Sequence, residues 1–225
     1  MDAAGHFIMG LGLTHIAVGR NAVGQPDIAA DDGAATHDDA TQYRGAGIDN
    51  DVILEDRIAY IGHGGVAWWG GWLLWHAAAI ALLALYAGLA GIWWQRGPIR
   101  CAVALLCAAA GQAADLTAET IYIGLLPGLR RDMFPAGEMA AGLLTGYLGN
   151  GLYTLAGILI TWVGARELPR ALLALGSAVW LGGLVLAAVS LARSPGGQTW
   201  STALLMPLFI LWSGLLGRWL GTRPS

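Results

Sequence analysis

The sequence predicts an all-α protein, a polytopic membrane helix bundle of six transmembrane helices, or alternatively five, with an acidic extramembrane N-terminal segment. Composition gives the first indication, since 56% of the 225 residues are hydrophobic and only 12% are charged. Soluble domains carry roughly 25% charged residues, so lipid must surround much of this chain. Strands are not expected, because backbone groups in lipid must find partners within a helix or a closed barrel.

Five long apolar stretches after residue 65 give the second indication. Residues 66–94 contain no Asp, Glu, Lys or Arg over 29 positions, and a helix needs only about 20 apolar residues to cross the hydrocarbon core. Four further helices are expected at 99–126, 138–165, 170–192 and 200–221. The breaks between them are short and rich in Gly and Pro, so successive helices should run antiparallel.

The first 65 residues divide into two parts. Residues 1–23 are expected to form a first membrane helix at about 4–23, because this apolar run lacks the basic start and the cleavage site of a signal peptide. A re-entrant or interfacial piece is the alternative. Residues 24–65 form an acidic extracytoplasmic segment, with nine of the fifteen acidic residues between positions 24 and 62. Residues 66–225 then form the five-helix bundle.

The arginines predict how the bundle lies in the cell membrane. Cytoplasmic helix ends are enriched in Arg and Lys, and six arginines lie near helix ends on one side against four on the other. The six are Arg96, Arg100, Arg166, Arg170, Arg218 and Arg223. The C-terminus is therefore expected in the cytoplasm and residues 24–62 outside, and exporting that acidic segment favours six helices over five.

Tryptophans and cysteines fit a membrane bundle. Eight of the eleven tryptophans fall near the predicted boundaries, as in the aromatic belts of membrane proteins. Trp75, Trp180 and Trp212 lie deeper and need packing or a ligand pocket to explain them. Cys101 and Cys107 are almost two helical turns apart in one apolar segment, so neither a disulfide nor a thiolate metal site is expected.

Asp115 and Glu119 are the most informative residues. An ionisable group at the centre of a membrane helix costs on the order of 2.5–3.5 kcal/mol and usually faces the bundle interior. Because they are four positions apart, both project from one helix face on consecutive turns, and Gln112 continues the stripe. Such a pair can exchange protons, or bind a cation when both carboxyls are ionised.

Other polar residues are expected at the same depth as this acid pair. At about 1.5 Å per residue, Asp115 lies roughly 16 Å and Glu119 roughly 10 Å below the outer end of their helix. By the same rise, His76 lies at roughly 15 Å and Asn150 at roughly 18 Å. His15 falls at roughly 12 Å if the first segment spans the membrane. This polar layer in the outer half of the bilayer is the strongest functional indication in the sequence.

The layer suggests a membrane-embedded enzyme or a binding site for a lipophilic or small substrate. The catalytic residues would then be Asp115, Glu119 and His76. The ligand-binding residues would be Asn150, Gln112, Tyr122 and Trp75. A metal version would use His15, His76, Asp115 and Glu119. This nitrogen and oxygen set suits iron, copper or zinc, and the residues do not otherwise define a cofactor.

Two other functions stay open. In a proton-coupled carrier, the two acids would titrate and His76 would relay the proton, although the internal repeat common in transporters is not evident. In an accessory subunit of a larger membrane complex, the layer would bond partner helices or hold a pigment or quinone. A structural interpretation is that Asp115 pairs with His76 and that Asn150, between two glycines, serves a kink or an interhelical bond.

The sequence also limits the partners. The expected partners are the lipid bilayer, a lipophilic small molecule, and partner membrane subunits or further copies of the chain. Nucleic acid is not expected, because the chain has no basic patch. No Walker loop, dinucleotide fingerprint, zincin helix or nucleophile elbow is present.

Overall fold

The computed structural model describes residues 50–63 and 65–222. The first predicted helix at 1–23 and most of the acidic segment therefore lie outside the described residues. Within the described part, all regular structure is helical and no strand occurs, which confirms the all-α prediction.

Seven α-helices follow one another along the described chain, and a π-helical segment joins two of them into one continuous helix. They are α2 (Asn50–His63), α3 (Gly65–Trp93), α4 (Pro98–Thr120), α5 (Phe134–Gly142), α6 (Asn150–Gly164), α7 (Arg170–Leu191) and α8 (Pro195–Gly221). Two π-helical segments, η5 (Ile121–Leu125) and η7 (Leu143–Gly149), extend α4 and join α5 to α6. Two short 3-10 turns are η4 (Trp94–Arg96) and η6 (Leu126–Gly128).

Within the described residues, five of the resulting continuous helices are long and apolar enough to cross a membrane. They cover Trp68–Arg96, Pro98–Gly128, Phe134–Gly164, Arg170–Leu191 and Pro195–Gly221. This confirms the five helices predicted after residue 65, with two earlier starts than expected. Both of those starts have proline in the first turn, where a helix tolerates it because that N–H needs no partner within the helix.

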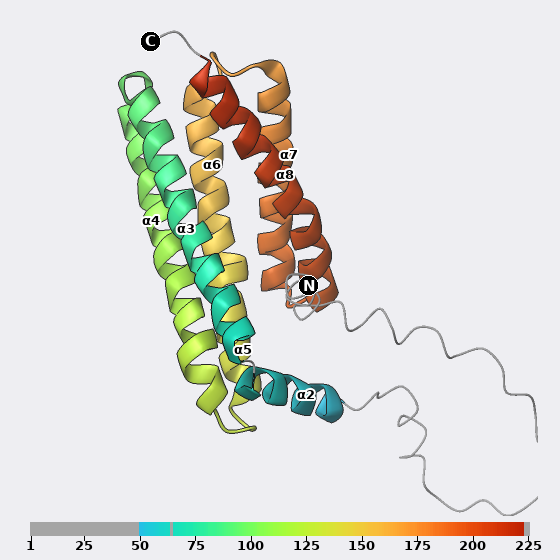
Figure 1. Ribbon diagram of the computed structural model, residues 1–225. Coiled ribbons are helices and arrows are strands. Elements are labelled where there is room, and N and C mark those ends of the chain that lie inside the picture. Colours follow the sequence, from blue (N-terminus) through green and yellow to red (C-terminus); the bar gives the residue numbers. More distant parts are fainter. Residues whose placement is uncertain (1–49, 64, 223–225) are drawn as a thin grey trace, which may run out of the picture.

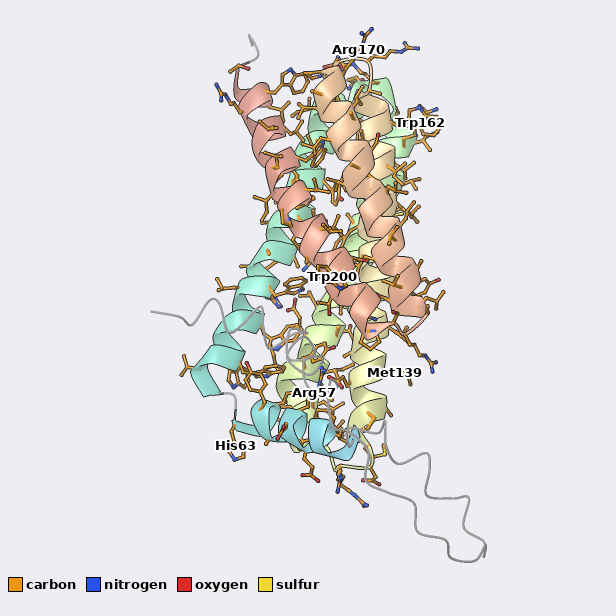
Figure 2. All side chains as sticks on the ribbon, turned by 90° about the vertical axis from the view of Figure 1, so that its right-hand side faces the viewer. Arg57, His63, Met139, Trp162, Arg170 and Trp200 are labelled. Atoms are coloured by element: carbon orange, nitrogen blue, oxygen red, sulfur yellow. The ribbon has the colours of Figure 1, made fainter. Side chains whose placement is uncertain are left out.

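The five spanning helices form an open bundle (Figure 1). α4, α6 and α7 are successive neighbours, α3 packs on α4 and α6, and α8 packs on α7. Figures 1 and 2 both show α3 and α8 on the same side of α6. α3 and α8 are therefore the two outer members of the arrangement.

α2 lies across the end of the bundle at which α3 begins (Figure 1). Gly65 stands at the start of α3 with φ +50°, a left-handed conformation that glycine adopts without strain. Ile61 of α2 is buried in a cluster with Phe134, and Arg57 forms an ion pair with Glu138 of α5. The last part of the acidic segment is thus an ordered cap on the bundle.

The deep tryptophans of the second half are explained by packing. The rings of Trp180 and Trp212 meet edge to face at 5.0 Å between centroids. The Trp180 indole N–H donates to Thr161 Oγ1 at 3.0 Å. Gly157 and Gly176 leave room for the two rings, because a Cβ at either position would collide with the indole beside it.

The boundary tryptophans divide into two groups. Trp162 is exposed, with the Arg100 guanidinium 4.3 Å above its ring, and Figure 2 shows it near Arg170 at the end of the bundle opposite Arg57. In contrast, Trp68, Trp72 and Trp93 are buried. An aromatic belt therefore accounts for only some of the tryptophans at these depths. Both cysteines are free, as their spacing predicts.

Candidate functional site

Six polar side chains from three spanning helices meet in one half of the bundle. His76 comes from α3, three residues come from α4, and two come from the divided helix η7–α6. We call this set the polar cluster: His76, Gln112, Asp115, Glu119, Thr145 and Tyr153. Its residues from α4 lie on the stripe that the sequence predicts to face the interior, and all three are buried.

Glu119 pairs with His76. Its side chain is 2% exposed, and its Oε2 is hydrogen-bonded to Nδ1 of the imidazole. The His76 side chain is 41% exposed, so the pair connects a buried carboxyl group to the outer face of α3. The other oxygen, Glu119 Oε1, is buried and has no hydrogen-bond partner among the described residues. His76 therefore pairs with Glu119 and not, as the structural interpretation of the sequence suggested, with Asp115.

Asp115 is held by neighbours from the divided helix. Thr145 Oγ1 donates to its Oδ1, and the Tyr153 hydroxyl lies 3.4 Å from its Oδ2. The same hydroxyl lies 3.3 Å from Gln112 Oε1. A phenol has one proton to donate, so Tyr153 is shared between Asp115 and Gln112. Gln112 Nε2 is buried, and no atom of residues 50–63 and 65–222 forms a hydrogen bond with it. Trp75, a predicted ligand-binding residue, lies near the Asp115 carboxyl group and packs against the cluster that contains Trp68 and Trp72.

A π-helical segment places Thr145. In η7 the carbonyl of Thr145 accepts the backbone N–H of Asn150, five positions later, and also its side-chain Nδ2 at 3.0 Å. Single π turns within α-helices occur frequently at functional sites. The amide of Asn150, predicted to bind a ligand, is thus engaged within its own helix.

Glycines allow α4 and the divided helix to approach closely at the cluster. A Cβ on Gly111 would lie 3.1 Å from the carbonyl oxygen of Gly149 and 3.1 Å from the Tyr153 ring. A Cβ on Gly149 would lie 3.5 Å from Asp115 Oδ1. Small residues at such crossings are typical of membrane helix packing, and here they bring Asp115 and Tyr153 together.

Aromatic residues continue the α3–α4 contact toward α2. The ring of Tyr122 stacks on that of Trp72, with centroids 4.4 Å apart and planes at 15°. Trp68 meets both rings edge-on. Trp72 is one turn from His76, and Tyr122 is one turn from Glu119, so the aromatic group borders the polar cluster. The ring of Tyr122, a predicted ligand-binding residue, is therefore already covered by Trp72.

The predicted metal centre is not supported. Among residues 50–63 and 65–222, no three His, Cys, Asp or Glu side chains are placed to hold a metal ion. His76 and Glu119 contact each other, but Asp115 is bonded instead to Thr145 and Tyr153. The fourth predicted ligand, His15, lies outside the described residues.

A surface hollow of about 840 Å³ lies at the α2 end of the bundle, apart from the polar cluster. Its lining is Leu54, Arg130, Arg131, Asp132 and Pro135. Arg130 and Asp132 are paired with each other at 3.1 Å. No member of the polar cluster lines this hollow, so the two features are separate.

Sequence reasoning did not single out Thr145. A threonine in a membrane helix commonly bonds a carbonyl of its own helix, as Thr117 and Thr120 do here. The π turn redirects Thr145 toward Asp115, and a π turn leaves no clear pattern in a single sequence. Tyr153 could have been found from its depth, which is close to that of Asn150.

The fold defines a multi-pass helical membrane protein, and the cluster gives it a buried acid–base group between three spanning helices. No protein-family model, curated protein or solved structure matches the chain.

Proposed function

We propose that the polar cluster is a membrane-embedded acid–base site that binds a small or lipophilic molecule and exchanges a proton with it. The observation that carries this proposal is that two buried atoms, Glu119 Oε1 and Gln112 Nε2, have no hydrogen-bond partner within the part of the chain that the structure describes. A buried polar atom without a hydrogen bond costs about 1–3 kcal/mol. The two residues lie on one helix face, about 10 Å apart along α4, so the acceptor and the donor are suited to two separate polar groups of one bound molecule.

Glu119 and His76 have the central roles in this proposal. Glu119 Oε1 would accept a proton from the bound molecule or donate one to it. The proton would pass between Glu119 Oε2 and His76 Nδ1, which are already hydrogen-bonded. Because the His76 side chain is 41% exposed, its second ring nitrogen can exchange the proton outside the buried cluster.

Asp115 and its partners support the ligand-binding side. Thr145 and Tyr153 place donors around the Asp115 carboxyl group, as a buried carboxylate requires. Tyr153 also contacts Gln112 Oε1, which orients the amide so that Nε2 is available to a ligand. We therefore assign Glu119 and His76 to proton exchange, Gln112 to ligand binding, and Asp115 to positioning.

Native mass spectrometry of the purified protein tests the proposal. The wild type should carry a small molecule that Glu119→Gln and Gln112→Leu lose or hold less tightly, while both variants still assemble. Thr117→Val is the matched control, because Thr117 lies on the exposed side of α4 and bonds only a carbonyl of its own helix. A wild type without any bound molecule, or variants that retain it fully, would count against the site.

A proton-coupled carrier is the second candidate, favoured by the connection of buried Glu119 to exposed His76. Proteoliposomes with a trapped pH-sensitive dye would then show proton uptake that Glu119→Gln abolishes.

The orientation we propose places α2 outside the cell and the C-terminus in the cytoplasm, because of the arginine distribution. A C-terminal fluorescent fusion that folds only in the cytoplasm should then be bright.

A further inference from the structure

The two ends of the bundle carry different charges. At the end where α4 and α7 begin and α8 ends, the described residues include five arginines and one acidic residue, Glu167. The five arginines are Arg96, Arg100, Arg166, Arg170 and Arg218. At the opposite end, which carries α2, the described residues include four arginines and five acidic residues. The first end therefore has an excess of four positive charges (five minus one), whereas the α2 end has an excess of one negative charge (five minus four).

Ion pairs follow the same division. Three of the four arginines at the α2 end are paired with acidic residues: Arg57, Arg130 and Arg131. At the other end Glu167 pairs with Arg96, and one carboxylate can balance only one of the guanidinium groups there. Because an arginine side chain keeps its charge in proteins, the excess charge must be balanced by anions from outside the described residues, either from solvent or from lipid.

Contacts between two chain connections bring most of these arginines together. The connection from α3 to α4 meets the end of α6, because the Arg100 guanidinium lies 4.3 Å from the centre of the Trp162 ring and Arg96 pairs with Glu167. Figure 2 shows Trp162 and Arg170 at this same end of the bundle. We call the four arginines of the two connections the arginine rim: Arg96, Arg100, Arg166 and Arg170.

Exposed aromatic side chains indicate that the rim lies at the level of the lipid headgroups. Trp162 is 60% exposed and Trp94 is 40% exposed, and indoles of membrane helices favour the headgroup level. The Trp162 ring covers one face of the Arg100 guanidinium, whereas the N–H donors at the edge of that planar group stay available. Such donors match the oxygens of a phosphate group in pairs.

Apolar side chains continue from the rim toward the middle of the bundle. Ile99, Val103 and Leu106 of α4 are 79%, 42% and 69% exposed. They are spaced four and three positions apart, so they line one face of the helix beside Arg100. A molecule held at the rim by its phosphate group could extend an acyl chain along this face. The arrangement therefore favours a phospholipid over a free phosphate ion, which gains nothing from apolar side chains.

We propose that the arginine rim binds the headgroup phosphates of anionic phospholipids. A zwitterionic headgroup also carries an ammonium group, which the excess positive charge of the rim disfavours. The rim lies at the end of the bundle opposite α2 and contains no residue of the polar cluster. This proposal is therefore independent of the acid–base site and of the molecule that it binds.

Native mass spectrometry of the full-length protein, released from nanodiscs with equal amounts of phosphatidylglycerol and phosphatidylcholine, tests the proposal. The wild type should retain phosphatidylglycerol in excess. Combining Arg100→Gln with Arg170→Gln, one arginine from each connection, should lower the ratio of the two retained lipids about fivefold or more, since each arginine near an anionic surface contributes about that factor. Both leaflets of a nanodisc have the same composition, so the orientation of the protein does not affect the result.

A control variant removes the same charge from the other end. Combining Arg130→Gln with Arg193→Gln should keep the wild-type lipid ratio. A wild type that retains both lipids equally would overturn the proposal. An equal loss of phosphatidylglycerol in the rim variant and the control would also overturn it, because retention would then follow net charge alone. If the double rim variant does not assemble, the two single variants carry the same comparison.

Inorganic phosphate distinguishes a lipid headgroup from a free anion. Phosphatidylglycerol in the nanodiscs should raise the Tm of the wild type and leave that of the rim variant unchanged. Inorganic phosphate added to nanodiscs of phosphatidylcholine alone should leave the Tm of both proteins unchanged. A rise in Tm with inorganic phosphate that the rim variant loses would reject the assignment to lipid.

Discussion

The imidazole of His76 in α3 is hydrogen-bonded to the carboxyl group of Glu119 in α4, across 43 positions of sequence. Glu119 is 2% exposed, whereas the His76 side chain is 41% exposed. The interaction therefore joins the buried interior of the bundle to its outer face. Removing either side chain should destabilise the other in its position, because one hydrogen bond joins the two groups.

His76→Ala should destabilise the protein. The substitution leaves both carboxyl oxygens of buried Glu119 without a partner, and an unsatisfied buried polar atom costs about 1–3 kcal/mol. A thermal unfolding assay in nanodiscs should show a lower Tm for this variant. His63→Ala is the control, since His63 is exposed and bonds only the carbonyl of Ala59 in its own helix. Equal Tm values for both variants would show that the pair contributes nothing to stability.

The double variant His76→Ala, Glu119→Gln extends this test. Gln at position 119 removes the buried carboxyl charge that lost its partner, so the double variant should be more stable than the sum of the two single changes predicts. The difference is the coupling energy of a double-mutant cycle. Additive effects would mean that His76 and Glu119 act independently in spite of their contact.

Tyr153→Phe should weaken the contact between α4 and α6. The change removes the hydroxyl shared by Asp115 and Gln112 and should cost about 0.5–1.5 kcal/mol, the net value of a typical hydrogen bond, or more because a buried acceptor loses its donor. Equilibrium unfolding in a mixed detergent and denaturant series measures this. Tyr147→Phe is the control, because Tyr147 lies exposed on the same divided helix and should behave as wild type.

Much of the bundle could be predicted because lipid imposes simple rules. Five long apolar stretches with few charged residues are typical of membrane helices, and the described part of the chain has five such helices at those positions. Their starts were harder to predict, because proline both interrupts helices and begins them. Phe134 and Pro195 therefore open helices several residues before the expected starts. The helix at 50–63 was not predicted as such, because it is stabilised by Phe134 and other residues far along the chain.

The rise per residue along each helix predicted which side chains lie at the same depth in the membrane, but not which of them contact each other. His76 and Glu119 do meet, and Asp115 lies beside residues from the next helix. Distance along a helix gives the level of a side chain, whereas its direction depends on how the helices are rotated against each other. Asn150 shows the difference, because it shares the level and yet bonds within its own helix.

Ile61→Ala should weaken the packing of α2 on the bundle far more than Arg57→Ala does. Ile61 is 5% exposed and packs in the cluster that ties α2 to the bundle, so its truncation should cost about 2–5 kcal/mol. The ion pair of Arg57 with Glu138 is half exposed on the arginine side, and such pairs contribute about 0–1 kcal/mol. Hydrogen exchange of residues 50–63, followed by mass spectrometry, should rise strongly in the first variant. The opposite order would mean that charge, and not burial, holds the cap.

Gly157→Ala should disturb the helix packing of the second half of the chain. A Cβ at this position would collide with the Trp180 ring, which is itself fixed by the hydrogen bond to Thr161 and the contact with Trp212. Because the indole cannot easily move away, the added methyl group should cost about 1–3 kcal/mol, as overpacking does elsewhere. Gly88→Ala is the matched control, since nothing lies within 4 Å of the Cβ it would introduce. Thermal unfolding should separate the two variants. If both unfold at the wild-type temperature, Trp180 is not confined by α6, and the packing explanation for the deep tryptophans must be replaced.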